Sequence, residues 1–104
     1  MVSETTIGIM LDDVSHQLIA AEVPVELVTY AVLHARDEMG GLGHYIDQPI
    51  PPEEYESTAT MVLVWIHSSF AHKRAGAVLE HDEHTQNACD TAASTASKWR
   101  MVFA

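Results

Sequence analysis

Residues 52–80 read PEEYESTATMVLVWIHSSFAHKRAGAVLE, and this segment constrains the predicted fold more than any other. A proline followed by two glutamates is typical of a helix start, because proline suits the first turn and acids favour the positive end of the helix dipole. The apolar residues that follow form two stripes at helical spacing. One stripe holds Tyr55, Ala59, Val62, Leu63, Ile66 and Phe70, and the other holds Met61, Trp65, Ser68, His72 and Leu79.

Two opposed stripes on one helix need two surfaces to pack against. The core of the chain itself can cover the first, and the second needs either another helix or a second copy of the chain. The sequence offers about four helices in total, and symmetric dimers are the commonest assemblies. We therefore expect a homodimer whose interface contains Met61, Trp65, His72 and Leu79.

The segment from Pro24 to Met39 is predicted to be a helix that is apolar around most of its circumference. Pro24 is expected at its first position and Gly40-Gly41 at its end. A helix of this kind lies centrally in a bundle or is covered by a partner chain. The glycine- and proline-rich residues 40–52, GGLGHYIDQPIPP, then form the one obvious loop.

The first and last segments also show helical periodicity. Ile7, Leu11, Val14 and Leu18 form one apolar stripe, with Asp12, Asp13 and His16 on the opposite side. The stripe of the last segment consists of Ala88, Cys89, Ala92, Ala96, Trp99 and Phe103. A break is expected between about 80 and 85, because acids at Glu80–Glu83 favour a helix start over a helix end.

These patterns together predict an all-α fold. We expect a compact bundle of about four helices, at roughly 4–22, 24–39, 52–80 and 83–103, in a single domain 1–104 that dimerisation completes.

The charge is distributed unevenly along the 104 residues. Residues 1–60 hold eleven acids and one base, Arg36, whereas residues 61–104 hold four acids and four bases. The formal net charge of −10 therefore arises in the first 60 residues. Such a surface attracts basic partners and repels nucleic acid, although acidic surfaces also serve simply to keep small domains soluble.

The composition also indicates the cellular compartment of the protein. Hydrophobic residues make up 47% of the chain, yet no run approaches the length of a membrane span. The start is charged and shows no cleavage signal, and a single cysteine suits a reducing compartment. We expect a cytoplasmic protein.

A histidine-rich cluster at Glu80, His81 and His84 is one candidate metal site. His84 is three residues from His81 and four from Glu80, so a continuous helix brings either pair to one face as ligands of a divalent transition metal. The spacing matches neither the zincin motif nor a Cys/His zinc motif, and a polar helix junction exposed to water is the simpler interpretation.

Catalytic motifs are absent. Cys89 lies among alanines without a neighbouring base, GGLG follows a helix instead of a strand, and no nucleophile elbow accompanies the serines and threonines near 91–97. His34 and Glu38 are four residues apart within an apolar arc. A histidine there is either a catalytic base, a pH-sensitive interface group or, most often, a hydrogen-bonded core residue.

Our first hypothesis is therefore a non-enzymatic interaction protein without a cofactor. Its acidic face binds a basic partner, most naturally a nucleic-acid-binding protein, and inhibits or regulates it by occupying the basic groove as a nucleic-acid mimic. The candidate contacts are Asp12, Asp13, Glu53, Glu54 and Glu56. A small, acidic, helical chain without motifs is similar in general profile to many phage-encoded inhibitors and small accessory proteins, and no individual residues match. The alternatives are a metal-binding or metal-responsive protein that uses His81 and His84, and a small enzyme that uses His34 and Glu38.

Overall fold

The computed structural model describes residues 4–101 and shows an all-helical protein, as expected. Its elements are α1 (Ile7–Ala20), α2 (Val25–Gly41), a short 3-10 helix η1 (Pro52–Glu54), α3 (Tyr55–Leu79) and α4 (Glu83–Ala96). Residues 4–101 contain no β-strand. None of the helices within this range combines the length and the hydrophobicity needed to cross a bilayer.

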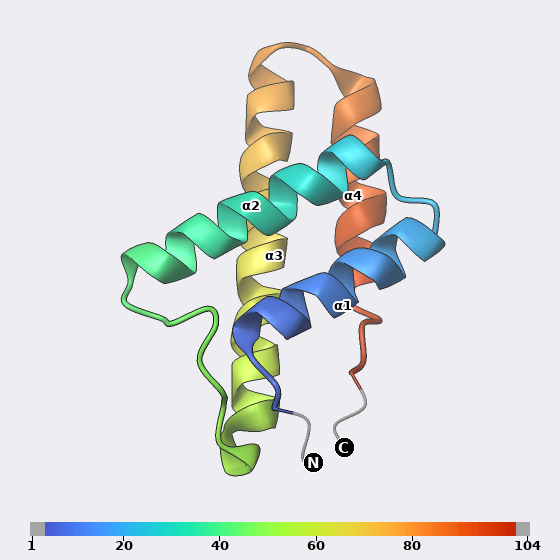
Figure 1. Cartoon of the computed structure of the whole chain (residues 1–104). Coiled ribbons are helices and arrows are strands. Elements are labelled where there is room, and N and C mark those ends of the chain that lie inside the picture. Colours follow the sequence, from blue (N-terminus) through green and yellow to red (C-terminus); the bar gives the residue numbers. More distant parts are fainter. Residues whose placement is uncertain (1–3, 102–104) are drawn as a thin grey trace.

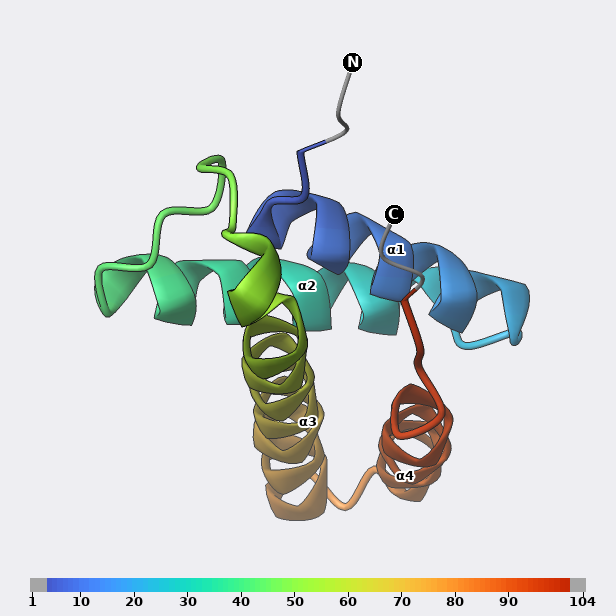
Figure 2. The same cartoon turned by 90° about the horizontal axis from the view of Figure 1, so that it is seen from below.

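The helices form two layers. α1 and α2 make one layer, which runs across α3 and α4 in the other (Figure 1). Figure 2 shows α3 and α4 nearly end-on, both on the same side of the α1–α2 layer. α3 packs mainly against α4 and α2, and the molecule measures 50 × 28 × 18 Å. α2 packs against α1 and α3 and leaves Val25 and Leu33 each 55% exposed, so the single chain does not cover its apolar circumference as expected.

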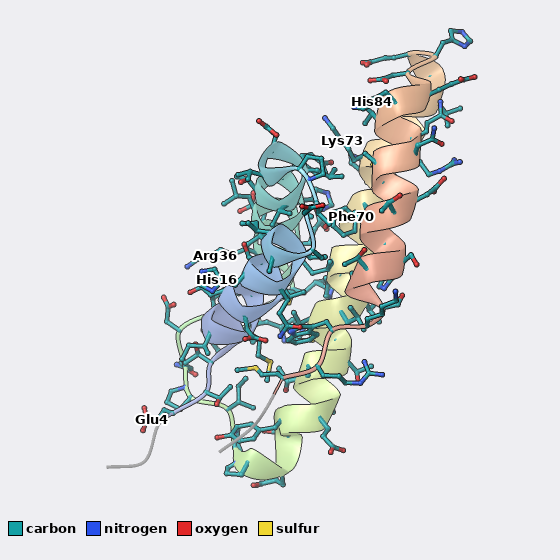
Figure 3. All side chains as sticks on the ribbon, turned by 90° about the vertical axis from the view of Figure 1, so that its right-hand side faces the viewer. Glu4, His16, Arg36, Phe70, Lys73 and His84 are labelled. Carbon is teal, nitrogen blue, oxygen red and sulfur yellow. The ribbon has the colours of Figure 1, made fainter. Side chains whose placement is uncertain are left out.

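The core lies between the two layers. Phe70 of α3 projects into this space (Figure 3) and is 1% exposed. Full burial of one such side chain contributes about 1.5–3 kcal/mol to stability. The other side chains that are no more than 2% exposed come from all four helices, and their hydrophobic members are Met10, Leu11, Val14, Leu18, Val28, Ala31, Ala35, Met39, Val62, Ile66, Cys89, Ala92 and Ala96.

Three of the helices end in the same Schellman motif, in which two backbone N–H groups beyond the helix bond to carbonyls of its last turn. The paired bonds are Glu22 to Ile19 and Val23 to Leu18 after α1, Gly43 to Gly40 and His44 to Met39 after α2, and His81 to Val78 and Asp82 to Ala77 after α3. The motif needs a left-handed residue, and the three that adopt it are Glu22 (φ 68°), Gly43 (φ 87°) and His81 (φ 57°).

Three predicted boundaries move, and the first of them moves because of this motif. α2 continues through Gly40 to Gly41 instead of ending at Met39, because the left-handed glycine of its terminal motif is Gly43. Pro24 precedes the first turn as the N-cap, one position earlier than expected. α1 starts later than residue 4, because the Thr6 hydroxyl caps it by accepting a hydrogen bond from the N–H of Ile9 at 3.1 Å.

The end of the last helix is a larger correction. α4 stops at Ala96 and does not run to 103, while residues 102–104, with the expected core residue Phe103, lie outside the described range. Tight turns follow Ala96, including a bond from the Trp99 N–H to the Ala96 carbonyl at 2.9 Å. These turns carry the Trp99 indole to α1, where it is buried. The break between α3 and α4 falls at residues 80–82, as predicted.

Candidate functional site

The acidic residues of the first 60 positions lie almost entirely on the surface. Ten of the eleven are exposed, and Asp13 is half-buried. Figure 3 shows Glu4 at the start of the described chain, and His16 and Arg36 on the outer side of the α1–α2 layer. Within residues 4–60 the structure shows one ion pair, Arg36 to Asp47, at 4.0 Å. This part of the surface therefore keeps most of its negative charge.

Asp13 differs from the other four predicted contacts. Its Oδ2 atom accepts one hydrogen bond from Gln17 Nε2 at 2.7 Å and another from Trp99 Nε1 at 2.8 Å. The Gln17 amide also donates to the Arg100 carbonyl at 2.9 Å. Asp13 thus joins the residues after α4 to α1, whereas Asp12, Glu53, Glu54 and Glu56 are exposed.

Two backbone hydrogen bonds bring the start of α1 beside the loop 42–51. The Gly8 N–H donates to the Ile46 carbonyl at 3.0 Å, and the Ile50 N–H donates to the Thr5 carbonyl at 2.8 Å. A Cβ atom on Gly8 would lie 3.4 Å from Ile46 Cγ2, so the loop packs closely on α1. Glu4, next to Thr5, and the acids of η1 therefore lie at one end of the molecule, and Asp12 is about two turns further along α1.

The loop borders an open hollow, which we call the loop groove. It has a volume of about 440 Å³ and is lined by residues of α1, the loop 42–51, η1 and α3. Its apolar surface includes Ile7, Ile50 and Met61. Glu54 and Tyr45 also line it, and Tyr45 is 70% exposed. Sequence analysis missed this groove, although a tyrosine within a proline-rich loop before three glutamates was the available signal.

The predicted dimer-interface residues fall into two environments. Met61 and Trp65 are half-buried and pack against the core of their own chain. His72 and Leu79 are exposed, Leu79 to 83%. The second stripe of α3 is therefore partly covered within the single chain.

His34 forms a hydrogen bond with the fully buried Ser69. The Ser69 hydroxyl donates to the Trp65 carbonyl at 2.8 Å, so it accepts from His34 Nδ1, also at 2.8 Å. His34 thus has the hydrogen-bonded structural role that is commonest for such residues. Within residues 4–101, no hydrogen bond joins His34 to Glu38.

The ring of His34 also takes part in a stack. It lies between Tyr30 and His72, with ring centroids 5.6 and 5.0 Å away. Lys73 Nζ lies 5.0 Å from the centroid of Tyr30. This stack joins α2 to α3 near their crossing.

The candidate metal ligands are separated by the break between α3 and α4. Glu80 caps α3, His81 occupies the left-handed position after it, and His84 belongs to the first turn of α4. Residues 4–101 contain no group of three histidine, cysteine or acidic side chains arranged to hold a metal ion.

Cys89 is a buried free thiol in α4. Burial raises its pKa, and the nearby Asp90 carboxylate acts in the same direction. A raised pKa disfavours the reactive thiolate, which agrees with a packing role.

No protein-family model, curated protein or solved structure matches this chain.

Proposed function

We propose that this protein is a non-enzymatic interaction protein that binds a basic, nucleic-acid-binding protein and inhibits it by occupying its basic groove. The observation that carries the proposal is the exposure of ten acidic side chains within residues 4–60, with one long ion pair among them. Carboxylates that have no cation within the chain can pair with cations of a partner.

The second half of the chain provides a contrast. There Arg74 and Asp90 form a close ion pair, with Nε and Oδ1 2.7 Å apart. Acids and bases are equal in number in residues 61–104, so this half has no charge excess to offer a partner. The acidic half therefore is the natural face for a cationic surface that otherwise binds phosphates.

The proposed contact face consists of Asp12, Glu53, Glu54 and Glu56. All four are exposed, and neither of the two ion pairs between described residues involves them. Asp13 was a candidate contact as well, but its carboxylate is already bonded to Trp99. Its replacement therefore reports on stability more than on binding.

The test compares two variants of equal charge. One replaces the proposed face (Asp12→Asn, Glu53→Gln, Glu54→Gln and Glu56→Gln), and the control removes four exposed acids elsewhere (Glu22→Gln, Glu26→Gln, Asp37→Asn and Glu80→Gln). Proteins retained by the wild type and by each variant are identified by mass spectrometry. Each purified partner is then assayed for nucleic-acid binding in the presence of the protein.

We expect the face variant to lose a basic partner that the control variant retains. We also expect the wild type to compete with nucleic acid for that partner, more strongly at low salt. A partner that both variants retain equally, or whose nucleic-acid binding is unaffected, contradicts the proposal.

The homodimer belongs to the same proposal. It is supported by the exposure of large apolar side chains along α3, at Val64, Val78 and Leu79. Native mass spectrometry of the untagged protein measures the subunit number and any bound metal together. A dimer that Leu79→Ser converts to monomer supports this interface, and a wild-type monomer contradicts it.

A further inference from the structure

The loop groove combines an apolar surface with one carboxylate and one exposed aromatic ring. Ile7, Ile50 and Met61 supply apolar contact, Glu54 supplies negative charge, and Tyr45 leaves most of its surface to solvent. None of the eleven residues that line the groove is lysine or arginine. Glu54 therefore has no lysine or arginine beside it in the groove, and His44 is the one imidazole in the lining.

These three features match the parts of a long cationic side chain. The methylene stem of arginine or lysine packs on apolar surface while its charged head stays near water. The head forms charge-assisted hydrogen bonds with a carboxylate and is attracted to the face of an aromatic ring. The volume of about 440 Å³ falls within the range of ligand pockets, so the groove has room for the side chain and some flanking backbone.

A second hollow on the other side of α3 is less selective for a cationic side chain. It has a volume of about 380 Å³ and is lined by Glu56, but Arg100 lines it too. A partner cation there meets an existing positive charge as well as a negative one. The comparison favours the loop groove as the place where a single cationic residue is held.

We propose that the loop groove binds one arginine or lysine side chain of the basic partner, with Glu54 pairing its charge and Tyr45 stacking on its head. This inference rests on the proposed function and gives it a central contact. The acids around the groove then attract the partner over a distance and speed its association. Glu54 and Tyr45 provide the direct contacts, which form only when the cationic side chain lies in the groove.

The experiment uses the full chain and a synthetic nona-arginine peptide as the probe. Binding is measured by isothermal titration calorimetry for the wild type, Glu54→Gln, the neighbouring control Glu53→Gln and Tyr45→Leu. Both glutamates are exposed residues of η1, but only Glu54 lines the groove. Circular dichroism confirms that each variant is folded, and ¹⁵N chemical-shift mapping of the wild type locates the bound peptide.

We expect Glu54→Gln to weaken binding about tenfold and Glu53→Gln about twofold. Tyr45→Leu should weaken binding about threefold, through loss of the cation–π contact. The amide signals of Tyr45, Ser57 and Thr58 should move on titration.

Equal effects of Glu53→Gln and Glu54→Gln, together with no effect of Tyr45→Leu, overturn the groove but leave the acidic face intact. A wild type that captures a basic partner yet does not bind nona-arginine also overturns the groove alone. Failure of the capture experiment with normal nona-arginine binding at the groove instead contradicts the proposed function.

Discussion

Trp99 and Asp13 make the contact of longest sequence separation among the side-chain hydrogen bonds of residues 4–101, 86 positions apart. Trp99 is 5% exposed, so its indole N–H has little access to water and depends on the carboxylate. We expect Asp13→Ala to lower the free energy of unfolding by about 1–3 kcal/mol, because a buried donor is left unpaired. Urea unfolding followed by circular dichroism measures the loss. Asp12→Ala is the matched control, and an equal loss in both variants contradicts the assigned role.

Helical periodicity could not distinguish these two aspartates. It correctly placed the buried residues Leu11, Val14 and Leu18 on one side of α1. It also assigned Asp13 to the outer side of the helix together with Asp12. The spacing of residues within one helix contains no information about Trp99, which comes from the other end of the chain. A long-range partner of a polar residue requires the tertiary structure.

The Schellman motifs define a prediction at the scale of the helix. Glu22 and His81 occupy left-handed positions that cost an L-residue about 1–2 kcal/mol, whereas α2 places Gly43 there. We expect Glu22→Gly and His81→Gly each to stabilise the protein by about 0.5–1 kcal/mol after the entropic cost of glycine, and Gly43→Ala to destabilise it by about 1 kcal/mol. The midpoints of urea unfolding provide the measurement.

A glycine at the neighbouring C-cap serves as the control for this effect. Ala21 has φ −86°, which any residue adopts, so Ala21→Gly should destabilise the protein. If Ala21→Gly and Glu22→Gly change stability in the same direction, the left-handed backbone of Glu22 does not lower the stability of the protein.

The start of α4 gives a pH-dependent prediction. The Thr85 hydroxyl donates to Asp82 Oδ2 at 2.6 Å and the Thr85 N–H donates to Oδ1 at 3.0 Å. The side-chain bond, followed by the backbone bond, lowers the pKa of Asp82 below 3.8. The carboxylate therefore stabilises α4 above its unfolded-state pKa, and this contribution is lost as the pH falls through the lower folded-state value.

Carbon-detected NMR titration measures the pKa of Asp82 directly. Thr85→Val removes the hydroxyl bond, which is the largest cause of the lowered pKa, so we expect the pKa of Asp82 to rise towards its ordinary value. The stability at neutral pH should fall, and the further loss of stability on acidification should become smaller. The backbone donor remains in this variant, and an unchanged pKa contradicts the importance of the hydroxyl.

Sequence patterns located the helices better than their ends. The four segments and the break at residues 80–82 follow from apolar periodicity and from the positions of prolines and acids. The ends depend on which residue becomes left-handed, and Glu22 and His81 carry no sequence signal for that conformation. The pair Gly40-Gly41 gave a misleading signal, because Gly43 provides the positive φ after α2.

The net charge of −10 acts on the molecule as a whole. Raising NaCl from about 0.01 M to about 0.1 M shortens the Debye length from about 30 to about 10 Å. We expect the melting temperature to rise, because repulsion among the acids weakens while the two partly exposed ion pairs contribute little. Differential scanning calorimetry of the wild type and of the four-residue face variant should show a smaller salt effect in the variant. Equal salt effects in the wild type and the face variant would show that the main repulsion arises among other acidic residues.

The crossing of the two layers was not predictable from the chain alone. Helical stripes indicate which side of each helix is buried but not which helix covers it. Met61 illustrates the limit, because it lines the groove beneath the loop 42–51 and packs on the core of its own chain. Sequence analysis considered only helices or a second copy as covers for this stripe, and treated the loop as a connection. The loop groove itself exists only once that loop has packed on α1.

The bond between Asp13 and Trp99 also sets an order of events during synthesis on the ribosome. α1 leaves the exit tunnel before the other helices, but Trp99, which bonds to Asp13 of α1, is added only after all four helices have been synthesised. The α3–α4 pair, whose helices are adjacent in sequence, can associate without waiting for a distant segment, whereas α1 acquires its final contact late. A nascent chain that stalls before Trp99 therefore contains the sequence of all four helices but lacks the hydrogen bond that joins the residues after α4 to Asp13.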